Sequence, residues 1–344
     1  MLNFTPNKIE FVDNKYNTYI YQVEEFSKIS NGLVILLKNF DNPIPLLIHE
    51  ETNPQHIEEL LNEFIFSQVQ LKPLIVIHQE EKLQTLIDQS IDQAQLIKEV
   101  KEGNITHRLY QIEKRESIDA LTFLFNKLPT LCIADGHHRY AALSGYFQSA
   151  QDFSSFSSGI LSVLFHTKKI RTRNCLAIIR QQNINSDQFL TKLEQDFNCE
   201  KLDQKKLPSK KNELILKLHN SYYALAPHID LKGVNIDIFD RLICKKALSI
   251  ADYSRHPLVQ LFFSEDPLDL LGQKEIAFTD MCFLLSKEDP NEIIEHAKQN
   301  KLLKPNSTYF VPKLLENMIV HDLKNSHMPV TLAKDNQYDY SLCP

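Results

Sequence analysis

Glycine is scarce in this sequence, with seven residues in 344, and the glycine-rich motifs of several large enzyme classes are missing. The chain contains no GxGxxG, no GxxxxGK followed by Ser or Thr, and no GxSxG. These absences remove the motif-based case for a dinucleotide-binding fold, a P-loop nucleotide hydrolase or an α/β-hydrolase. Any phosphate site in this protein would therefore depend largely on side chains.

Cysteine is also scarce, and no two of the six cysteines form a CxxC pair. Several stand inside apolar runs, which is typical of buried free thiols in a reducing compartment. This spacing argues against a disulfide framework and against a structural zinc site. The cysteines are Cys132, Cys175, Cys199, Cys244, Cys282 and Cys343.

Long apolar runs and an excess of positive charge are missing as well. No run reaches the roughly 18 residues of a membrane helix, and residues 1–8 lack the layout of a signal peptide. The net charge is −6 and the pI is about 6.1, which makes nucleic acid an unlikely main partner. We expect a cytoplasmic protein without a membrane partner; the sequence predicts no particular oligomeric state.

The length exceeds that of one typical hydrophobic core, so we expect two lobes. Strand and helix patterns are mixed without the regular βαβ order of a Rossmann domain. We therefore predict an α+β fold with mixed sheets and helices. A first lobe is expected over residues 1–166, a second α/β lobe over 167–330, and a loose tail over 331–344.

Hydrophobic periodicity places the individual elements. In the first lobe it predicts a helix from Gln55, a helix over 79–101 that allows a break, and a helix over 117–128. It predicts strands at 17–23, 33–37, 74–78, 108–112 (an edge strand) and 131–134. Farther along, it predicts a strand pair at 159–167 and 175–179, a hairpin at 213–218 and 222–227, a β-rich stretch at 274–285, and helices over 186–197, 235–248 and 291–299.

The most distinctive stretch is LCIADGHHRYAAL, residues 131–143. Residues 131–134 predict a buried strand, Asp135-Gly136 a turn, and the apolar spacing from Tyr140 a helix. A helix N-terminus that carries a glycine, two histidines and an arginine is suited to bind an anion such as phosphate; these residues are Gly136, His137, His138 and Arg139. In the alternative interpretation, Asp135 is only a helix cap and the histidines face solvent.

A second polar cluster, His49-Glu50-Glu51-Thr52, also follows a strand and precedes a helix. A carboxylate in such a loop can act as a general base toward a substrate hydroxyl, which makes Glu50 a candidate. The alternative is a surface His-Glu pair with Thr52 capping the next helix. The spacing of His49 and the two later histidines gives no support for zinc, and we predict no definite metal ligand.

Near the end of the chain, Ser307, Thr308 and Lys313 offer two hydroxyls and a cation. Lys304 and Lys313 are candidates to contact phosphate oxygens as mobile point charges, and the alternative is a polar hairpin loop. The basic segment 168–173 is interpreted as a solvated hairpin end, and the alternative is a segment that steers phosphate. His107 is interpreted as a structural strand residue.

These blocks together resemble a known family. The box ADGHHR at 134–139 resembles the signature of the bacterial domain-of-unknown-function 1015 family. Three further blocks agree in order and approximate spacing: HEET at 49–52, HRLY at 107–110 and KPNSTYFVPK at 304–313. The resemblance covers roughly residues 30–323. The box is similar, more distantly, to the phosphate-binding loop of the ParB/sulfiredoxin superfamily, which includes free-serine kinases.

The resemblance implies a ParB/sulfiredoxin-like catalytic lobe with the site between the lobes, and an ATP- or ADP-dependent kinase. The acceptor would be a small hydroxyl compound such as free L-serine, and Mg²⁺ would bridge phosphate oxygens. It implies that Glu50 acts as the base and that His49 positions it. It also implies that Asp135 orients the box or holds Mg²⁺. The implied phosphate ligands are residues 136–139, and the further phosphate or substrate contacts are Thr52, Ser307, Thr308 and Lys313.

Two other hypotheses remain open. Leu47 and Ile48 stand where the family often has basic residues, and residues 55–62 hold no match for an arginine found there. These differences favour the alternative of a nucleotide- or ligand-binding regulatory protein without catalysis. ParB-like nucleic-acid binding is the third hypothesis, and the acidic charge balance argues against it.

Overall fold

A computed structural model describes residues 9–10, 18–38, 44–149, 159–180, 185–228 and 233–323. The tail expected over 331–344 lies outside these residues. Contacts divide the chain into two compact units that interleave along the sequence. Unit 1 comprises Met1–Ile48, Thr52–Ile170 and Pro312–Pro344, and unit 2 comprises His49–Glu51 and Arg171–Val311.

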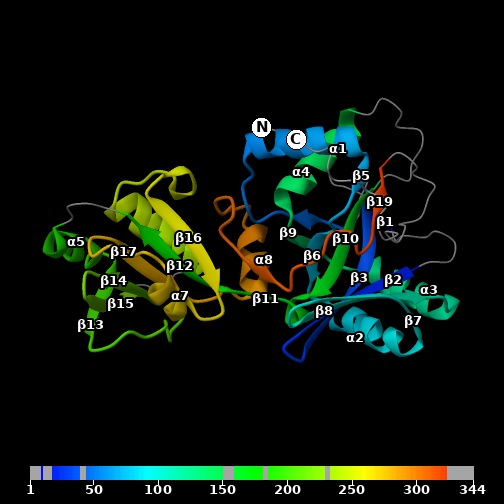
Figure 1. The fold of residues 1–344 in the computed structure, drawn as a ribbon, viewed down its shortest axis with the longest axis horizontal. Coiled ribbons are helices and arrows are strands. Elements are labelled where there is room, and N and C mark those ends of the chain that lie inside the picture. The colour runs from blue at the N-terminus through cyan, green and yellow to red at the C-terminus, as the bar shows by residue number, and fades with distance from the viewer. Residues whose placement is uncertain are drawn as a thin grey trace. The chain divides into compact units, whose positions relative to one another are not determined.

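Unit 1 is built on a nine-stranded mixed sheet (Figure 1). The strand order is β4-β9-β6-β10-β3-β2-β8-β7, and β1 also pairs with β3. The pairs β6–β10 and β4–β9 are parallel and the others antiparallel. The bounds are β1 Ile9–Glu10, β2 Thr18–Glu25, β3 Lys28–Lys38, β4 Leu46–Leu47, β6 Leu74–His78, β7 Gln95–Glu102, β8 Ile105–Ile112, β9 Leu131–Asp135 and β10 Gly159–His166.

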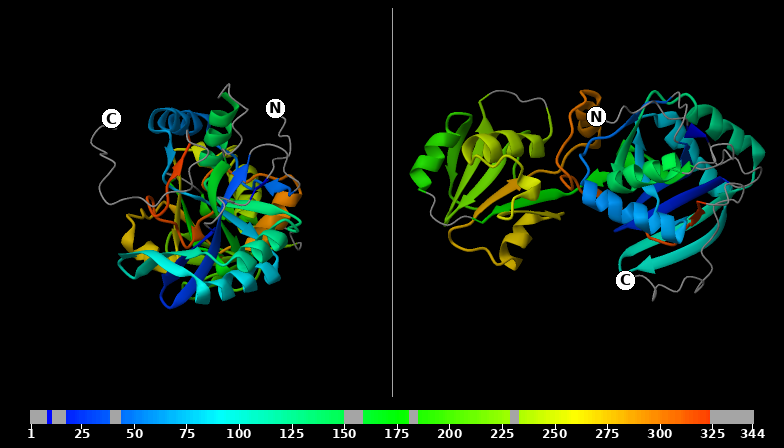
Figure 2. Two further views of the ribbon diagram at one scale, coloured as in Figure 1. Left: turned by 90° about the vertical axis from the view of Figure 1, so that its right-hand side faces the viewer. Right: turned by 90° about the horizontal axis from the view of Figure 1, so that it is seen from above.

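Four α-helices of unit 1 bury their apolar faces in one core with this sheet. They are α1 Pro54–Ser67, α2 Glu81–Ser90, α3 Arg115–Phe125 and α4 His137–Ser149. Phe64 of α1 and Leu143 of α4 belong to this core together with Val76 and Ile133 of the sheet, and α1 lies beside α4 (Figures 1 and 2). Shorter elements are η1 Ile91–Gln93, η2 Thr167–Lys169, and the strand pair β5 Val69–Gln70 and β19 His321–Asp322.

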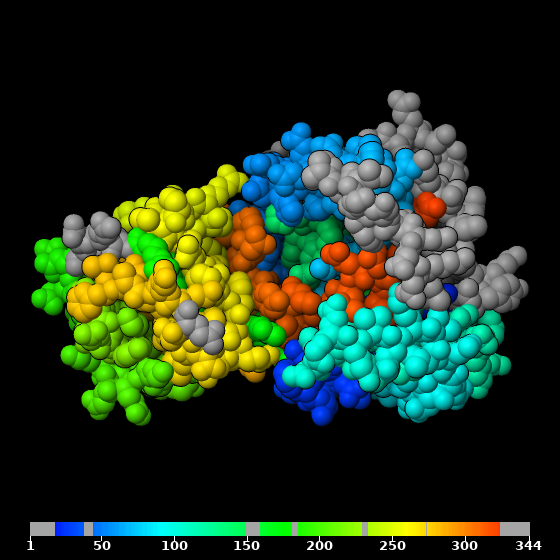
Figure 3. All heavy atoms as spheres, viewed as in Figure 1, coloured from blue at the N-terminus to red at the C-terminus, as the bar shows by residue number. Residues whose placement is uncertain are grey.

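The last described segment of unit 1, from residue 312, returns to this unit after the chain has built unit 2. The Lys98 ammonium of β7 donates to the carbonyl of Asn317 at 3.1 Å, and the Tyr21 hydroxyl of β2 accepts from the N–H of Leu315. In the space-filling view this orange-red segment lies at the surface beside the cyan residues of β7 (Figure 3). These contacts anchor the segment that carries Lys313.

Unit 2 is built on a six-stranded antiparallel sheet of order β13-β15-β14-β17-β12-β16. The strands are β12 Asn174–Ile179, β13 Phe197–Leu202, β14 Leu214–Leu218, β15 Ser221–Pro227, β16 Val259–Ser264 and β17 Met281–Leu285. Its helices are α5 Ser186–Leu193, α6 Asn235–Ile238 continued by the π-helix η3 Phe239–Ala247, η4 Tyr253–Arg255, α7 Pro267–Gln273 and α8 Pro290–Lys298. A short ladder pairs β11 Arg171–Thr172 with β18 Phe310–Val311.

The predicted α+β class with mixed sheets is confirmed. The strand at 74–78, the helix from Gln55 and the hairpin at 213–227 are also confirmed. Other predicted elements differ in extent, and two are clearly shorter than expected. The β-rich stretch at 274–285 is a strand only over Met281–Leu285, and the helix at 186–197 ends at Leu193.

Three predictions of local structure are wrong. The helix over 79–101 ends near residue 93, and Gln95–Glu102 is an edge strand. Ile97 and Val100 fit a helical period, but pairing with β8 overrides it. Because β7 takes the edge, β8 lies inside the sheet instead of at its margin. The strands near 159–167 and 175–179 are not paired with each other but belong to different units, and the basic segment between them is the connection from unit 1 to unit 2.

Candidate functional site

The predicted site residues fall into two clusters, one in each unit. In unit 1, β9 ends at Asp135 and α4 begins at His137. Gly136 between them has φ 99°, a conformation that residues with a side chain rarely adopt. A Cβ at this position would lie 2.6 Å from Leu74 Cδ2 and 2.9 Å from Arg139 Nη2. The turn therefore requires glycine, and it places the first backbone N–H groups of α4 directly after the strand.

Asp135 is the charged centre of this turn. Its Oδ1 accepts a 2.6 Å hydrogen bond from the Lys313 ammonium, and its Oδ2 accepts one at 3.0 Å from the Arg139 guanidinium. Burial alone would raise the pKa of Asp135, but Lys313, Arg139 and Lys72 together lower it. The carboxylate is therefore ionised at neutral pH and held between two cations.

The Arg139 guanidinium forms hydrogen bonds with three other residues. Its Nη1 donates to the carbonyls of Lys72 at 2.8 Å and Pro73 at 2.7 Å, and its Nη2 donates to Asp135. These bonds fasten the first turn of α4 to the chain just before β6. The geometry thus gives Arg139 a role in positioning Asp135, and its predicted contact with phosphate remains a prediction.

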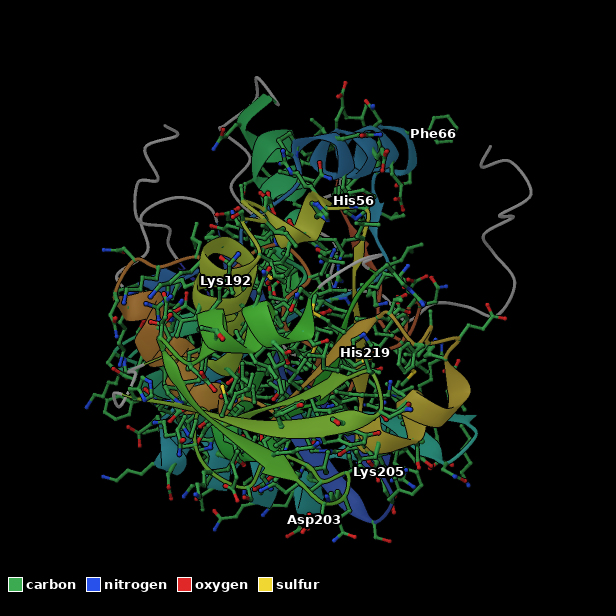
Figure 4. The ribbon with its side chains drawn as sticks, turned by 90° about the vertical axis from the view of Figure 1, so that its left-hand side faces the viewer. His56, Phe66, Lys192, Asp203, Lys205 and His219 are labelled. Carbon is green, nitrogen blue, oxygen red and sulfur yellow. The ribbon has the colours of Figure 1, made fainter. Side chains whose placement is uncertain are left out.

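His138 links the N-termini of two helices. Its Nε2 accepts a 2.9 Å hydrogen bond from the backbone N–H of Asn53, the N-cap residue of α1. Burial and the neighbouring His56 lower the pKa of His138, so the ring is neutral and carries its proton on Nδ1. His56 of α1 contacts this ring edge-on at 4.9 Å; Figure 4 labels His56 and Phe66, which lie near the two ends of α1. The positive ends of both helix dipoles therefore meet at His138.

The other two predicted site residues of unit 1 are His137 at the start of α4 and Thr52 just before α1. His137 is buried, whereas Thr52 is half-buried and directly precedes Asn53. The side chain of Asn53, rather than that of Thr52, caps α1 by accepting from the N–H of Gln55 at 3.0 Å. The Asn53-Pro54 pair is a sequence signal for this helix start.

In unit 2, Glu50 is buried and bound by the loop of the closing block. Its Oε1 accepts from the N–H of Thr308 at 2.8 Å and from the Thr308 hydroxyl at 2.6 Å. Its Oε2 accepts from the N–H of Asn306 at 3.1 Å. The backbone beside it pairs with the same region, because the N–H of Glu51 donates to the carbonyl of Leu303. The sequence carried no signal for the contribution of Asn306.

His49 is linked to the Glu50 carboxylate through the Thr308 hydroxyl. The hydroxyl of Thr308 uses its one proton on Glu50, so it accepts from His49 Nε2 at 3.1 Å. The His49 ring is fully buried and lies edge-on to Phe310. A chain of hydrogen bonds thus runs from His49 through Thr308 to Glu50.

Ser307 and Lys304 stabilise the same loop. The Ser307 hydroxyl donates to the carbonyl of Lys304 and lies 2.8 Å from the Tyr253 hydroxyl. The Lys304 ammonium forms hydrogen bonds of 3.0 and 2.9 Å with the Glu51 carboxylate. Lys304 therefore has a partner within unit 2.

Two remaining candidates lie away from these clusters. His107 of β8 is buried, and its Nδ1 is 3.2 Å from the Tyr21 hydroxyl; burial lowers its pKa to about 4. This supports the interpretation of His107 as a structural strand residue. In the basic segment, Arg171 pairs with Glu265 at 3.1 Å.

Metal ligands do not gather in the part of the chain that the structure describes. Within it, no three His, Cys, Asp or Glu side chains come together to hold a metal ion. Nor does a helix in the same residues have the length and apolar character needed to cross a membrane.

Comparison with known proteins identifies the family. Residues 1–246 match the model of the proteins of unknown function DUF1015. The chain belongs to this family, as the ADGHHR box predicted. No curated protein sequence matches it.

Several solved structures are similar to this chain. One is SbnI with a C-terminal truncation from Staphylococcus aureus, with 10% identity, a TM-score of 0.45, and 82% of this chain and 85% of that chain covered. A free serine kinase variant in complex with ADP shows 13% identity and a TM-score of 0.44, over 86% and 94% of the two chains. A conserved hypothetical protein from Pyrococcus furiosus shows 14% identity and a TM-score of 0.40, over 79% and 89%.

Proposed function

We propose that this protein binds the phosphates of a nucleotide at the Asp135–Arg139 turn and transfers a phosphoryl group to the hydroxyl of a small molecule. The observation that carries the proposal is the meeting of two helix N-termini at the hydrogen bond between Asn53 and His138. A helix N-terminus binds anions through backbone N–H groups and the helix dipole. Two such ends, with Lys313 at the same turn, favour a multiply charged anion.

Each residue of the turn has a distinct part in this proposal. Gly136 lets the phosphates approach the backbone, and His138 donates from Nδ1. Arg139 keeps the turn in place through the carbonyls of Lys72 and Pro73. Lys313 exchanges its bond with Asp135 for a phosphate oxygen, because a flexible ammonium acts as a mobile point charge.

Mg²⁺ fits this arrangement as a companion of the nucleotide. It is usually bound by one or two carboxylates plus substrate phosphates, without an all-protein cage. Asp135 is the carboxylate at the turn, and it becomes available to the ion when Lys313 moves to the phosphates. The bound ion supplies neutralisation of phosphate charge.

Glu50 is the proposed base for the acceptor hydroxyl. It would take the hydroxyl proton while the oxygen bonds to the transferred phosphorus and the nucleotide leaves with the bonding electrons. Thr308 and His49 hold the carboxylate in one orientation. Along the chain, Glu50 precedes Asn53, the partner of His138, by three residues.

A second candidate is a nucleotide-binding regulatory protein that does not catalyse. The observation that favours it is the binding of both Glu50 oxygens by the loop at 306–308. In that case the carboxylate anchors the loop, and no substrate proton reaches it.

The test is a product screen with ATP and ADP over amino acids and small alcohols, run with wild type and Glu50→Ala. We expect a phosphorylated product, and a loss of turnover of about 10²–10⁴-fold in the variant with nucleotide affinity nearly unchanged. Equal losses in turnover and affinity would contradict the base assignment. Nucleotide binding without a product from any acceptor would favour the regulatory protein.

A further inference from the structure

The loop that binds Glu50 is itself held by a residue from another part of unit 2. The N–H groups of Asn306 and Thr308 donate to the two carboxylate oxygens of Glu50. Ser307 lies between these two donors in the chain. Its buried hydroxyl gives its one proton to a carbonyl of the same loop, so it accepts from the Tyr253 hydroxyl at 2.8 Å. Tyr253 therefore holds the middle of the loop that binds the carboxylate.

The conformation of this loop determines how Glu50 is bound. Asn306 has φ 57°, a left-handed conformation that asparagine adopts more readily than most residues. Turns that contain such a residue can direct neighbouring N–H groups at one anion. Here that anion is the Glu50 carboxylate, and the Thr308 hydroxyl is a third donor to it. The orientation of the carboxylate therefore depends on the conformation of residues 306–308.

Tyr253 is fixed by aromatic contacts within unit 2. It lies in η4 and is buried, and its ring contacts Phe239 of η3 edge-on, with 5.8 Å between the ring centroids. Phe239 contacts Phe283 of β17 edge-on at 5.4 Å. Burial raises the pKa of the Tyr253 phenol well above its ordinary value of 10, and the Glu50 carboxylate adds to this rise. The phenol is therefore a neutral hydrogen-bond donor whose ring is packed in place.

We propose that Tyr253 is a positioning residue for Glu50 and that it acts through Ser307 and the loop at 306–308. The inference rests on the proposed function for the role of Glu50 as the base. A general base must lie within hydrogen-bond reach of the proton that it takes, and a small displacement of a catalytic group lowers the rate strongly. The Tyr253 hydroxyl keeps the three donors of the loop on Glu50 and thereby keeps the carboxylate in one orientation.

The first test is Tyr253→Phe, which removes the hydroxyl and keeps the aromatic ring. Tyr222→Phe is the matched control, because Tyr222 is a half-buried phenol of β15 that packs against an apolar cluster of the same unit. Amide hydrogen exchange of Asn306 and Thr308, followed by mass spectrometry, reports on their bonds to Glu50 and needs no substrate. We expect exchange at least about tenfold faster in Tyr253→Phe and unchanged in Tyr222→Phe. Unchanged exchange in Tyr253→Phe overturns the proposal.

Kinetics with the acceptor found in the product screen separate positioning from a purely structural role. We expect Tyr253→Phe to lower kcat at least about fivefold and to leave the KM for nucleotide nearly unchanged. The acidic limb of its pH–rate profile should move to higher pH, because donors that are held less well stabilise the Glu50 carboxylate less. An unchanged kcat, or a lower kcat with an unmoved acidic limb, overturns the proposal.

Ser307→Ala tests whether Tyr253 acts through Ser307. We expect the double variant Tyr253→Phe/Ser307→Ala to lose about as much kcat as Ser307→Ala alone, because both changes break the same link. Losses that multiply would show independent roles and overturn the proposal. If wild type forms no product with any acceptor, the proposed function fails instead. The exchange of Asn306 and Thr308 still decides in that case whether Tyr253 holds the donors of Glu50.

Discussion

Gly136 offers a sharp test of how the turn before α4 is built. Replacing it with alanine forces a side chain into φ 99°, which costs about 1–2 kcal/mol. The new Cβ also lies 2.6 Å from Leu74 Cδ2, and overpacking of this kind costs about 1–3 kcal/mol. We therefore expect Gly136→Ala to lower the free energy of unfolding by about 2–5 kcal/mol.

Gly145, inside α4, is the matched control. A Cβ there meets no atom within 4 Å, and its φ is not positive. Because alanine is the better helix former, Gly145→Ala should raise the free energy of unfolding by about 0.5–1 kcal/mol. The same substitution thus has effects of opposite sign just before α4 and within it.

The assay is urea denaturation followed by circular dichroism at 222 nm, since the chain has no tryptophan to report by fluorescence. Nucleotide titration of both variants is the second measurement. We expect Gly136→Ala to lose nucleotide binding and Gly145→Ala to keep it. If Gly136→Ala is as stable as wild type, the conformation assigned to this turn is wrong.

Two further predictions concern the same unit. Lys313→Met removes a cation that lowers the pKa of Asp135. It should lower the free energy of unfolding by about 1–3 kcal/mol at pH 7. A carboxyl group whose pKa is lowered on folding stabilises the protein at pH values above its pKa in the unfolded chain, about 3.9. The loss in the free energy of unfolding should therefore shrink as the pH falls below about 4. A loss that is independent of pH would contradict the assignment. Asn53→Ala removes the α1 cap and should lower the free energy of unfolding by about 1 kcal/mol. Asn53→Asp should retain the cap and the stability of wild type. Equal effects of both changes would refute the capping role.

The elements that could be predicted from the sequence are those with a strong local pattern. The strand at 74–78 is an unbroken apolar run, and α1 has both a helical period and an Asn-Pro start. The edge strand Gln95–Glu102 could not be recognised, because its identity comes from pairing with β8 and its own pattern also fits a helix. Tertiary pairing overrides a weak local preference there.

The candidate site also has parts that follow from the local sequence and parts that depend on the tertiary fold. The turn of ADGHHR and the helix that follows it are local, and both are present. The contact of Lys313 with Asp135 joins residues that are 178 positions apart, and no spacing rule predicts it. The contact of the Asn306 N–H with Glu50 was missed for the same reason, because it joins residues that are far apart in the sequence.

Calorimetric titration of wild type and His138→Ala with ATP and with ADP, in the presence of Mg²⁺, would show whether this turn binds nucleotide phosphates. His219→Ala is the control, because His219, which Figure 4 labels, lies in unit 2 and contacts Ser186 and Phe278. We expect wild type and His219→Ala to bind nucleotide, and His138→Ala to bind it at least about tenfold more weakly. Absence of nucleotide binding to wild type, or equal affinity in all three proteins, would contradict the assignment of the Asp135–Arg139 turn as a nucleotide phosphate site.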